Sequence, residues 1–142
     1  METSKQQKIL VVEDVAPMRN FLKAVLEQSF EDIVVATVPN GNEAIRALLQ
    51  DEFDLVICDW EMPGMDGLTL VQLVRKEPEW KDLPIIMVTA KSEKQDVLQA
   101  INLGINDYIV KPITITGLAA KVRAKLPGLV EKKMDDGSPS QG

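Results

Sequence analysis

Five short apolar runs recur along the chain, and longer segments with apolar residues at helical spacing separate them. The runs cover residues 8–12, 33–37, 55–58, 85–88 and 107–110. Continuous apolar runs of this length indicate strands buried on both faces, and their alternation with helices is typical of βαβ units. The pattern therefore predicts an α/β fold in which five βα units, (βα)5, form a doubly wound, five-stranded parallel sheet.

The helices between these runs are predicted from the same periodicity together with their start signals. Helical spacing is found over residues 17–28, 43–50, 68–76, 93–103 and 115–126. Asn40, Asp66, Ser92 and Thr114 precede four of these segments, and such side chains commonly accept a backbone N–H at a helix N-cap. Pro17 stands in the first turn of the first helix, where its missing N–H costs no hydrogen bond.

The length and composition of the chain predict one globular domain. Its 142 residues are 45% hydrophobic, which is enough for a buried core. We place the domain at residues 8–128, and we expect a mobile N-terminus at residues 1–7 and a disordered tail at residues 129–142, because both ends are polar and lack periodicity. No N-terminal apolar stretch resembles a signal peptide or a membrane span, so we expect a cytoplasmic protein.

Three further counts exclude classes of function. The single cysteine, Cys58, rules out an intrachain disulfide, and the absence of histidine rules out histidine-dependent catalysis. The net charge of −6 argues against a general affinity for nucleic acid or for anionic membranes.

Polar residues with distinct chemistry follow four of the predicted strands. Glu13 and Asp14 follow the first, Asp59 the third, Thr89 the fourth and Lys111 the fifth. In the flavodoxin-like strand order 2-1-3-4-5, ligands bind outside the carboxyl ends of the strands, where the winding direction reverses. We therefore expect these five side chains to meet at one edge of the sheet.

Three carboxylates at one edge require a cation. At an effective dielectric of about 20, two unit charges 4 Å apart repel by roughly 4 kcal/mol. Oxygen ligands at a site open to water suit Mg²⁺, whereas zinc prefers cysteine and histidine. An ammonium and a hydroxyl beside this cluster, from Lys111 and Thr89, are suited to bind phosphoryl oxygens.

Four segments at these strand ends resemble the motifs of two-component response regulator receiver domains. They are Val-Val-Glu-Asp at residues 11–14, Asp-Trp-Glu-Met-Pro-Gly-Met-Asp-Gly at residues 59–67, Val-Thr-Ala at residues 88–90 and Lys-Pro at residues 111–112. The resemblance spans about residues 8 to 126 and is strongest to chemotaxis regulators of the CheY type, whose strand order is 2-1-3-4-5.

The resemblance implies roles at the site. Asp59 would accept a phosphoryl group from a phosphohistidine of a partner kinase. Asp14, Asp59 and the backbone carbonyl of Glu61 would ligate Mg²⁺, and Glu13 would act through water. Lys111 and Thr89 would bind the phosphoryl group. Backbone N–H groups of Trp60 and Ala90 would complete the anion cradle.

The resemblance also implies a switch and its partners. Thr89 and Tyr108 would move on phosphorylation, and the Lys111–Pro112 peptide is expected to be cis. The surface of the fourth helix, fifth strand and fifth helix would then bind a target. Its candidate contact residues are Ser92, Tyr108, Val110, Ile113, Thr114 and Lys121.

The implied partners are a CheA-like histidine kinase, a flagellar motor switch protein and a phosphatase. The protein would act as a monomer, with no enzymatic activity beyond phosphotransfer and autodephosphorylation.

Two charged residues at the mouth of the site depart from the CheY pattern. Glu61 lies two residues after Asp59, and Lys91 lies two residues after Thr89. We expect Glu61 and Lys91 to pair across the site and to hinder the water that hydrolyses the aspartyl phosphate. A contact between Glu61 and Lys111 is the alternative.

Other functions share part of this pattern. A haloacid-dehalogenase-type phosphatase also uses an aspartate nucleophile and Mg²⁺, but it needs a second aspartate where this chain has Glu61. A flavodoxin-like electron carrier has the same fold, but the acidic loop 13–17 would repel the phosphate of FMN. A stand-alone receiver or phosphorelay module outside chemotaxis, or the receiver part of a longer regulator, stays open as the alternative.

Overall fold

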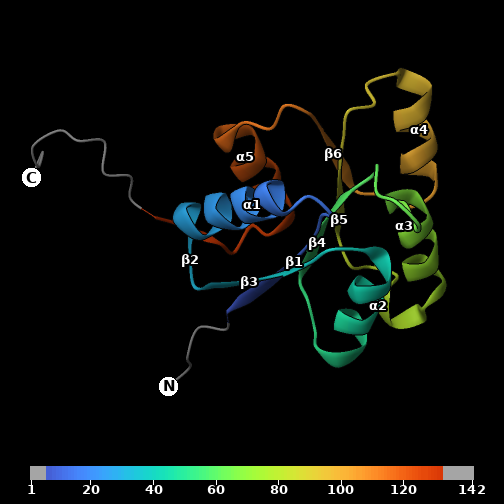
Figure 1. Ribbon diagram of the computed structural model, residues 1–142. Coiled ribbons are helices and arrows are strands. Elements are labelled where there is room, and N and C mark those ends of the chain that lie inside the picture. Colours follow the sequence, from blue (N-terminus) through green and yellow to red (C-terminus); the bar gives the residue numbers. More distant parts are fainter. Residues whose placement is uncertain (1–5, 133–142) are drawn as a thin grey trace, which may run out of the picture.

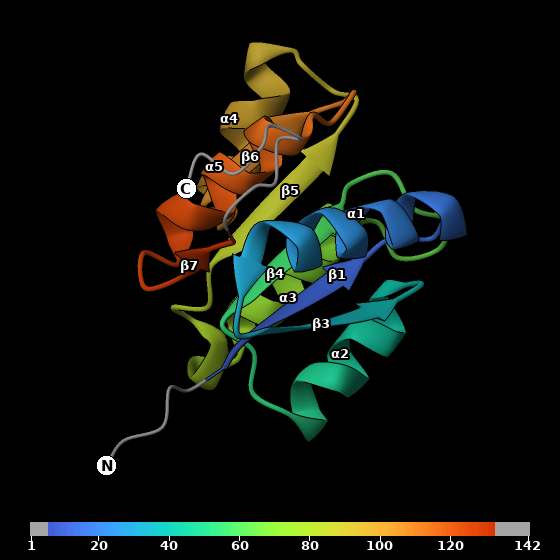
Figure 2. The same ribbon diagram turned by 90° about the vertical axis from the view of Figure 1, so that its left-hand side faces the viewer.

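The central element of the fold is a five-stranded parallel sheet. In the computed structural model, which describes residues 6–132, its strands are β1 (Gln7–Val12), β3 (Ile33–Val38), β4 (Leu55–Asp59), β5 (Ile85–Thr89) and β6 (Asp107–Val110). Their order is β3-β1-β4-β5-β6, and the arrows run in the same direction in Figure 2. The predicted (βα)5 fold and its 2-1-3-4-5 order are therefore confirmed.

Helices cover both faces of this sheet (Figure 1). They are α1 (Ala16–Ser29), α2 (Gly41–Gln50), α3 (Gly67–Lys76), α4 (Lys94–Asn102) and α5 (Ile115–Lys125), with a short 3-10 turn, η1 (Pro78–Trp80). Helices α1 and α5 pack on one face, and α2, α3 and α4 pack on the other. Alternate residues of β1 enter the two cores: Ile9 faces α1 and α5, whereas Leu10 faces the other three helices. No helix in residues 6–132 is long and apolar enough to span a bilayer.

Three of the four predicted N-caps form as expected. The side chains of Asn40, Asp66 and Thr114 accept backbone N–H groups three residues later, from Glu43, Thr69 and Gly117. The prediction for Ser92 is wrong. Helix α4 has Glu93 at its N-cap, without a side-chain cap, because its first turn closes on the Glu93 carbonyl through the N–H of Val97.

Both predicted chain ends need correction at their inner residues. Gln7, which was predicted to belong to a mobile segment, is part of β1. The tail was predicted from residue 129, but Val130–Glu131 forms β7, which pairs antiparallel with β2 (Phe30–Glu31). Leu129 is buried in the same core cluster as Phe30. A two-residue strand has no periodicity, so the sequence carried no signal for it. Residues 1–5 and 133–142 lie outside the described part of the chain.

Candidate functional site

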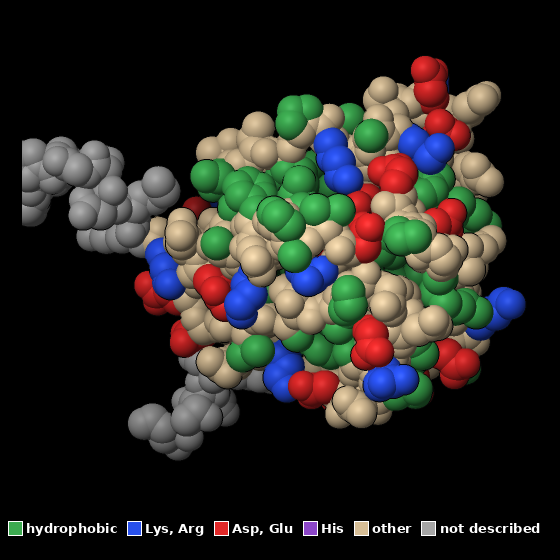
Figure 3. Space-filling model, viewed as in Figure 1, with side chains coloured by type: hydrophobic (Ala, Val, Ile, Leu, Met, Phe, Trp, Pro, Cys, Tyr) green, Lys and Arg blue, Asp and Glu red, His purple; other side chains and the backbone are tan. Residues whose placement is uncertain are grey.

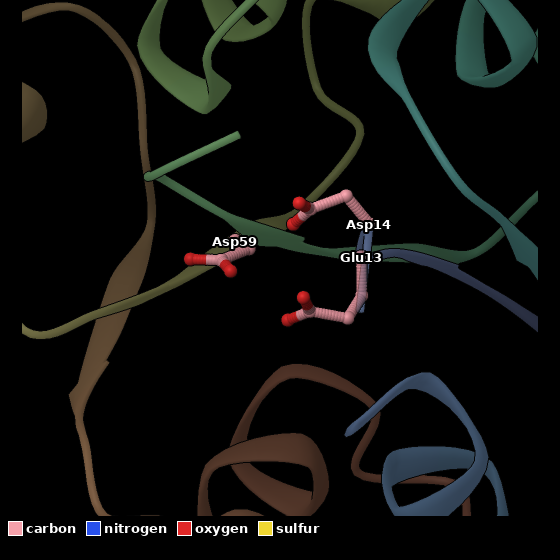
Figure 4. Close-up of side chains that lie close together, drawn as sticks. All are labelled: Glu13, Asp14 and Asp59. Atoms are coloured by element: carbon pink, nitrogen blue, oxygen red, sulfur yellow. The ribbon is translucent and has the colours of Figure 1, made fainter. Parts of the chain in front are cut away.

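Four of the five polar side chains predicted to meet at the strand ends lie together, whereas the fifth, Thr89, contacts Glu61. Glu13, Asp14 and Asp59 each offer a carboxylate oxygen, and these atoms lie within 4.8 Å of one another. Figure 4 shows the three side chains close together, two from the end of β1 and one from the end of β4. Lys111 reaches the same point, with its Nζ 3.1 Å from Asp59 Oδ2. The Lys111–Pro112 peptide is cis, as predicted.

The loop after β4 is held close beneath Asp59 by a glycine. The Gly67 N–H donates to the Trp60 carbonyl at 2.8 Å, which folds the loop back on itself. A Cβ on Gly67 would lie 2.3 Å from the Asp59 carbonyl oxygen and 2.8 Å from the Trp60 Cα. Only glycine permits this approach, and the position of the Asp59 backbone depends on it.

The loop after β1 is held by an arginine that no sequence motif singles out. Arg19 Nη1 donates to the Glu13 carbonyl at 2.7 Å and lies 3.4 Å from the Asp14 carbonyl. The only sign of this role in the sequence is that Arg19 lies in the first turns of α1, shortly after Glu13 and Asp14. The contact fixes the backbone that carries two of the three carboxylates.

Burial makes the acidic cluster electrostatically unfavourable without a cation. Glu13 and Asp59 are 1% and 3% exposed. Desolvation, together with the neighbouring Asp59, raises the pKa of Glu13 to about 7, although a hydrogen bond from the Val15 N–H opposes the shift. Burial by itself would lower the pKa of Lys111, but its hydrogen bond to Asp59 and the charges of Asp59 and Glu13 outweigh burial and raise it.

The donor set of this cluster fits a hard divalent cation. Glu13 Oε1 and Asp14 Oδ1 are buried and have no hydrogen-bond partner, so each has a free lone pair for a ligand. A donor set made only of carboxylate oxygens suits Mg²⁺. Burial raises the pKa of the neighbouring Cys58 thiol, which donates to the Asp59 carbonyl at 3.2 Å and packs as a buried residue. The role of the Glu61 backbone carbonyl as a metal ligand stays a prediction.

The predicted Glu61–Lys91 pair is wrong. Glu61 Oε2 accepts the Thr89 hydroxyl at 2.6 Å, and Glu61 Oε1 accepts the Ala90 N–H at 3.2 Å. Lys91 Nζ instead lies 5.3 Å from the centroid of the Trp60 ring. The alternative pair with Lys111 does not form either: the carboxylate that Lys111 contacts is that of Asp59. The sequence does not reveal that a backbone N–H and a hydroxyl lie within reach of Glu61.

The prediction that the Trp60 N–H belongs to the anion cradle is also wrong. The Trp60 N–H donates to the Val88 carbonyl at 2.9 Å and continues the β4–β5 ladder, so it is not free for an anion. The next N–H along the chain, that of Glu61, donates to Asp59 Oδ1 at 3.2 Å. The Ala90 N–H does face the site, where the Glu61 carboxylate occupies it.

The predicted output surface is at least partly accessible along its length. Tyr108 is half-buried on β6, and Lys121 Nζ lies 5.7 Å from its ring centroid while donating to Asp107 Oδ1 at 2.8 Å. The other predicted contact residues are exposed or half-buried: Ser92, Val110, Ile113 and Thr114. On the face shown in Figure 3, acidic and basic side chains are interspersed around apolar ones.

Comparisons with known proteins agree with this geometry. The response regulator receiver domain family matches residues 9–123. Chemotaxis protein CheY-3 of Vibrio cholerae is 37% identical over 130 residues, which cover 91% of this chain and 95% of that protein. A CheY homolog of Campylobacter jejuni is 42% identical over 116 residues, covering 81% and 88%. The solved structure of V. cholerae CheY4 superposes with a TM-score of 0.78 at 27% identity, covering 84% of this chain and 98% of that one.

Proposed function

Because the chain belongs to the response regulator receiver domain family, we propose that Asp59 accepts a phosphoryl group from a phosphohistidine of a partner histidine kinase. One observation carries the proposal. The Asp59 carboxylate lies between the ammonium of Lys111 and the carboxylates of Glu13 and Asp14 at the carboxyl edge of the sheet. Receiver domains are signalling domains, and phosphorylation of this carboxylate is the signal.

The phosphotransfer step needs little from the protein beyond positioning. An Asp59 carboxylate oxygen forms a bond to phosphorus while the bond from phosphorus to the kinase histidine nitrogen breaks, and the electron pair stays on that nitrogen. Lys111 holds the carboxylate in place and offers its ammonium to the incoming phosphoryl oxygens. The Thr89 hydroxyl and the Ala90 N–H are the remaining donors at this edge.

Asp14, Asp59 and the backbone carbonyl of Glu61 would ligate Mg²⁺, and Glu13 would act through water. The buried oxygens of Glu13 and Asp14 that lack a hydrogen-bond partner support this assignment. A bound Mg²⁺ supplies positive charge that balances the carboxylates and the phosphoryl oxygens.

Output passes through the surface formed by α4, β6 and α5. Phosphorylation draws Thr89 toward the phosphoryl group and turns Tyr108, which changes the face that a target contacts. Since relatives of this chain are named chemotaxis proteins, a flagellar motor switch protein is the proposed target and a CheA-like kinase the donor. Glu61 and Lys91 border the site mouth and set the lifetime of the phosphorylated state, with a phosphatase as a further partner.

The test is treatment with acetyl phosphate and Mg²⁺, followed by intact mass measurement. The wild-type protein should gain one phosphoryl group, and Asp59→Asn should gain none. Asp66→Asn is the matched control, because Asp66 lies on the same loop and asparagine caps α3 equally well, so its adduct should persist. Asp14→Asn should need more Mg²⁺ for the same yield. An adduct on Asp59→Asn would contradict the assignment.

A further inference from the structure

The Glu61 carboxylate occupies the donors that a phosphoryl group on Asp59 would use. Its two oxygens accept hydrogen bonds from the Thr89 hydroxyl at 2.6 Å and from the Ala90 N–H at 3.2 Å. The first distance is typical of a charge-assisted hydrogen bond between a hydroxyl and a carboxylate. We propose that Glu61 is an internal anion that fills the phosphoryl subsite of the resting protein and must leave it when Asp59 is phosphorylated. This inference rests on the function proposed above.

The competition follows from the number of hydrogens that each donor has. A threonine hydroxyl donates one hydrogen bond, and so does a backbone N–H. The Thr89 hydroxyl also accepts the Lys91 N–H at 2.9 Å, which leaves its single hydrogen for Glu61. Neither Thr89 nor Ala90 can therefore serve Glu61 and a phosphoryl oxygen at the same time. Two anions held at the same donors would also repel each other.

Beside the site there is space for the Glu61 side chain when it is displaced. A hollow of about 630 Å³ lies beside the site, and its lining includes Trp60, Glu61, Met62 and Lys91. Glu61 is an exposed residue, so a rotation of its side chain requires no repacking of the core. The Lys91 ammonium over the Trp60 ring would then face the released carboxylate. A contact between Glu61 and Lys91, which the resting protein lacks, would then form only in the phosphorylated protein.

Occupation of the phosphoryl subsite by Glu61 changes what the Thr89 contact signals. In the resting protein the Thr89 hydroxyl is already bonded to an anion, so its engagement does not by itself report phosphorylation. Glu61 also lowers the affinity of the subsite for any external phosphoryl mimic. Removing the carboxylate should therefore strengthen the binding of such a mimic, whereas removal of a contact that only supported the fold would weaken it.

The first test is beryllium fluoride binding in the presence of Mg²⁺, followed by ¹⁹F NMR of the bound fluoroberyllate. Glu61→Gln keeps the size of the side chain and removes its charge, and we expect it to lower the Kd about tenfold. Glu61→Ala should lower it at least as much. Glu93→Gln is the matched control: it removes a negative charge three residues after Ala90, on a side chain that makes no cap hydrogen bond, and should change the Kd less than twofold. Equal affinities for wild type and Glu61→Gln would overturn the inference.

The second test needs neither metal nor mimic. The amide proton of Ala90 should resonate downfield in the metal-free wild type, because it is bonded to a carboxylate, and should move upfield in Glu61→Gln. An unchanged Ala90 amide would overturn the inference by itself. If no protein binds fluoroberyllate, wild type included, the proposed function fails, and the Ala90 amide alone decides whether Glu61 occupies the subsite.

Discussion

Lys111 Nζ lies 3.1 Å from Asp59 Oδ2, and this contact joins the end of β6 to the end of β4 across the intervening strand β5. The aspartate is 3% exposed, and the lysine side chain is 27% exposed. The pair therefore places one partly exposed positive charge against a buried carboxylate. Glu13 and Asp14 add two further carboxylates at the same point. Lys111 performs part of the charge balance that a metal ion would otherwise supply.

The first prediction follows from this balance. In Lys111→Met the repulsion between the ammonium and a bound cation is removed, so we expect Mg²⁺ to bind about tenfold more tightly, equivalent to about 1.4 kcal/mol. Isothermal titration calorimetry measures the change. Lys91→Met is the control, because its ammonium lies over Trp60, and it should leave the Kd within about twofold. Weaker Mg²⁺ binding by Lys111→Met would contradict the electrostatic account.

The second prediction concerns pH. The pKa of Glu13 is raised from 4.5 to about 7 in the folded protein, so the native state binds more protons than the unfolded state between these values. The contribution of Glu13 to stability is therefore fully present below pH 4.5 and is lost as pH rises through 7. In EDTA, the unfolding free energy should fall across this window by at most about 1.4 kcal/mol per pH unit from this group.

Urea denaturation at several pH values checks the second prediction. Glu13→Gln should flatten the slope, because the neutral amide does not titrate. Glu52→Gln, at an exposed position, should retain it. The chain has no histidine, so few other groups titrate between pH 5 and 7. An equal slope in Glu13→Gln and wild type would mean that Glu13 titrates normally.

The third prediction concerns the glycine beneath Asp59. In Gly67→Ala the new Cβ would meet backbone atoms of Asp59 and Trp60, which cannot move cheaply, so we expect a loss of about 3 kcal/mol of stability. Gly128→Ala is the control, since a Cβ there meets nothing within 4 Å, and its stability should change by less than about 0.5 kcal/mol. Urea denaturation compares the two variants. Similar stabilities would show that the loop tolerates a side chain.

The fourth prediction tests the ordered residues after α5. Leu129 is 9% exposed and lies in the core cluster with Phe30, whereas its neighbour Val130 is 56% exposed. Leu129→Ala should cost about 2 kcal/mol, because it leaves a cavity beside Phe30. Val130→Ala should stay within about 0.5 kcal/mol. Thermal and urea denaturation both measure the difference, and a neutral Leu129→Ala would support a tail that begins at residue 129.

Most of the fold could be predicted because its signals are local. The apolar runs locate the strands to within one residue at each end, as at β4, which extends from the predicted 55–58 to Asp59. The caps at Asn40, Asp66 and Thr114 are contacts within one turn, and they form as predicted. Ser92 fails because a cap also depends on where the first helical bond closes, which the flanking loop decides.

Strand pairing outside the main sheet could not be predicted for a different reason. The strand β7 exists because Val130–Glu131 lies beside Phe30–Glu31, about one hundred residues earlier in the chain. Two residues are too short to carry a periodic pattern, so only the packing of α1 and α5 brings these edges together. The ion pair between Arg123 and Glu131 depends on the same packing.

The residue pattern alone establishes which strands and helices follow one another along the chain and which polar side chains lie at one edge of the sheet, because apolar periodicity and strand direction decide both. Which donor meets which acceptor at that edge depends on the three-dimensional packing. Glu61 bonds to Thr89 and Ala90 rather than to Lys91, and the Trp60 N–H stays in the sheet. The physical reason is that a hydrogen bond forms or fails on differences of a few tenths of an ångström in the donor–acceptor distance. Many of the partners are also backbone groups that every residue has, so the amino-acid sequence does not identify them.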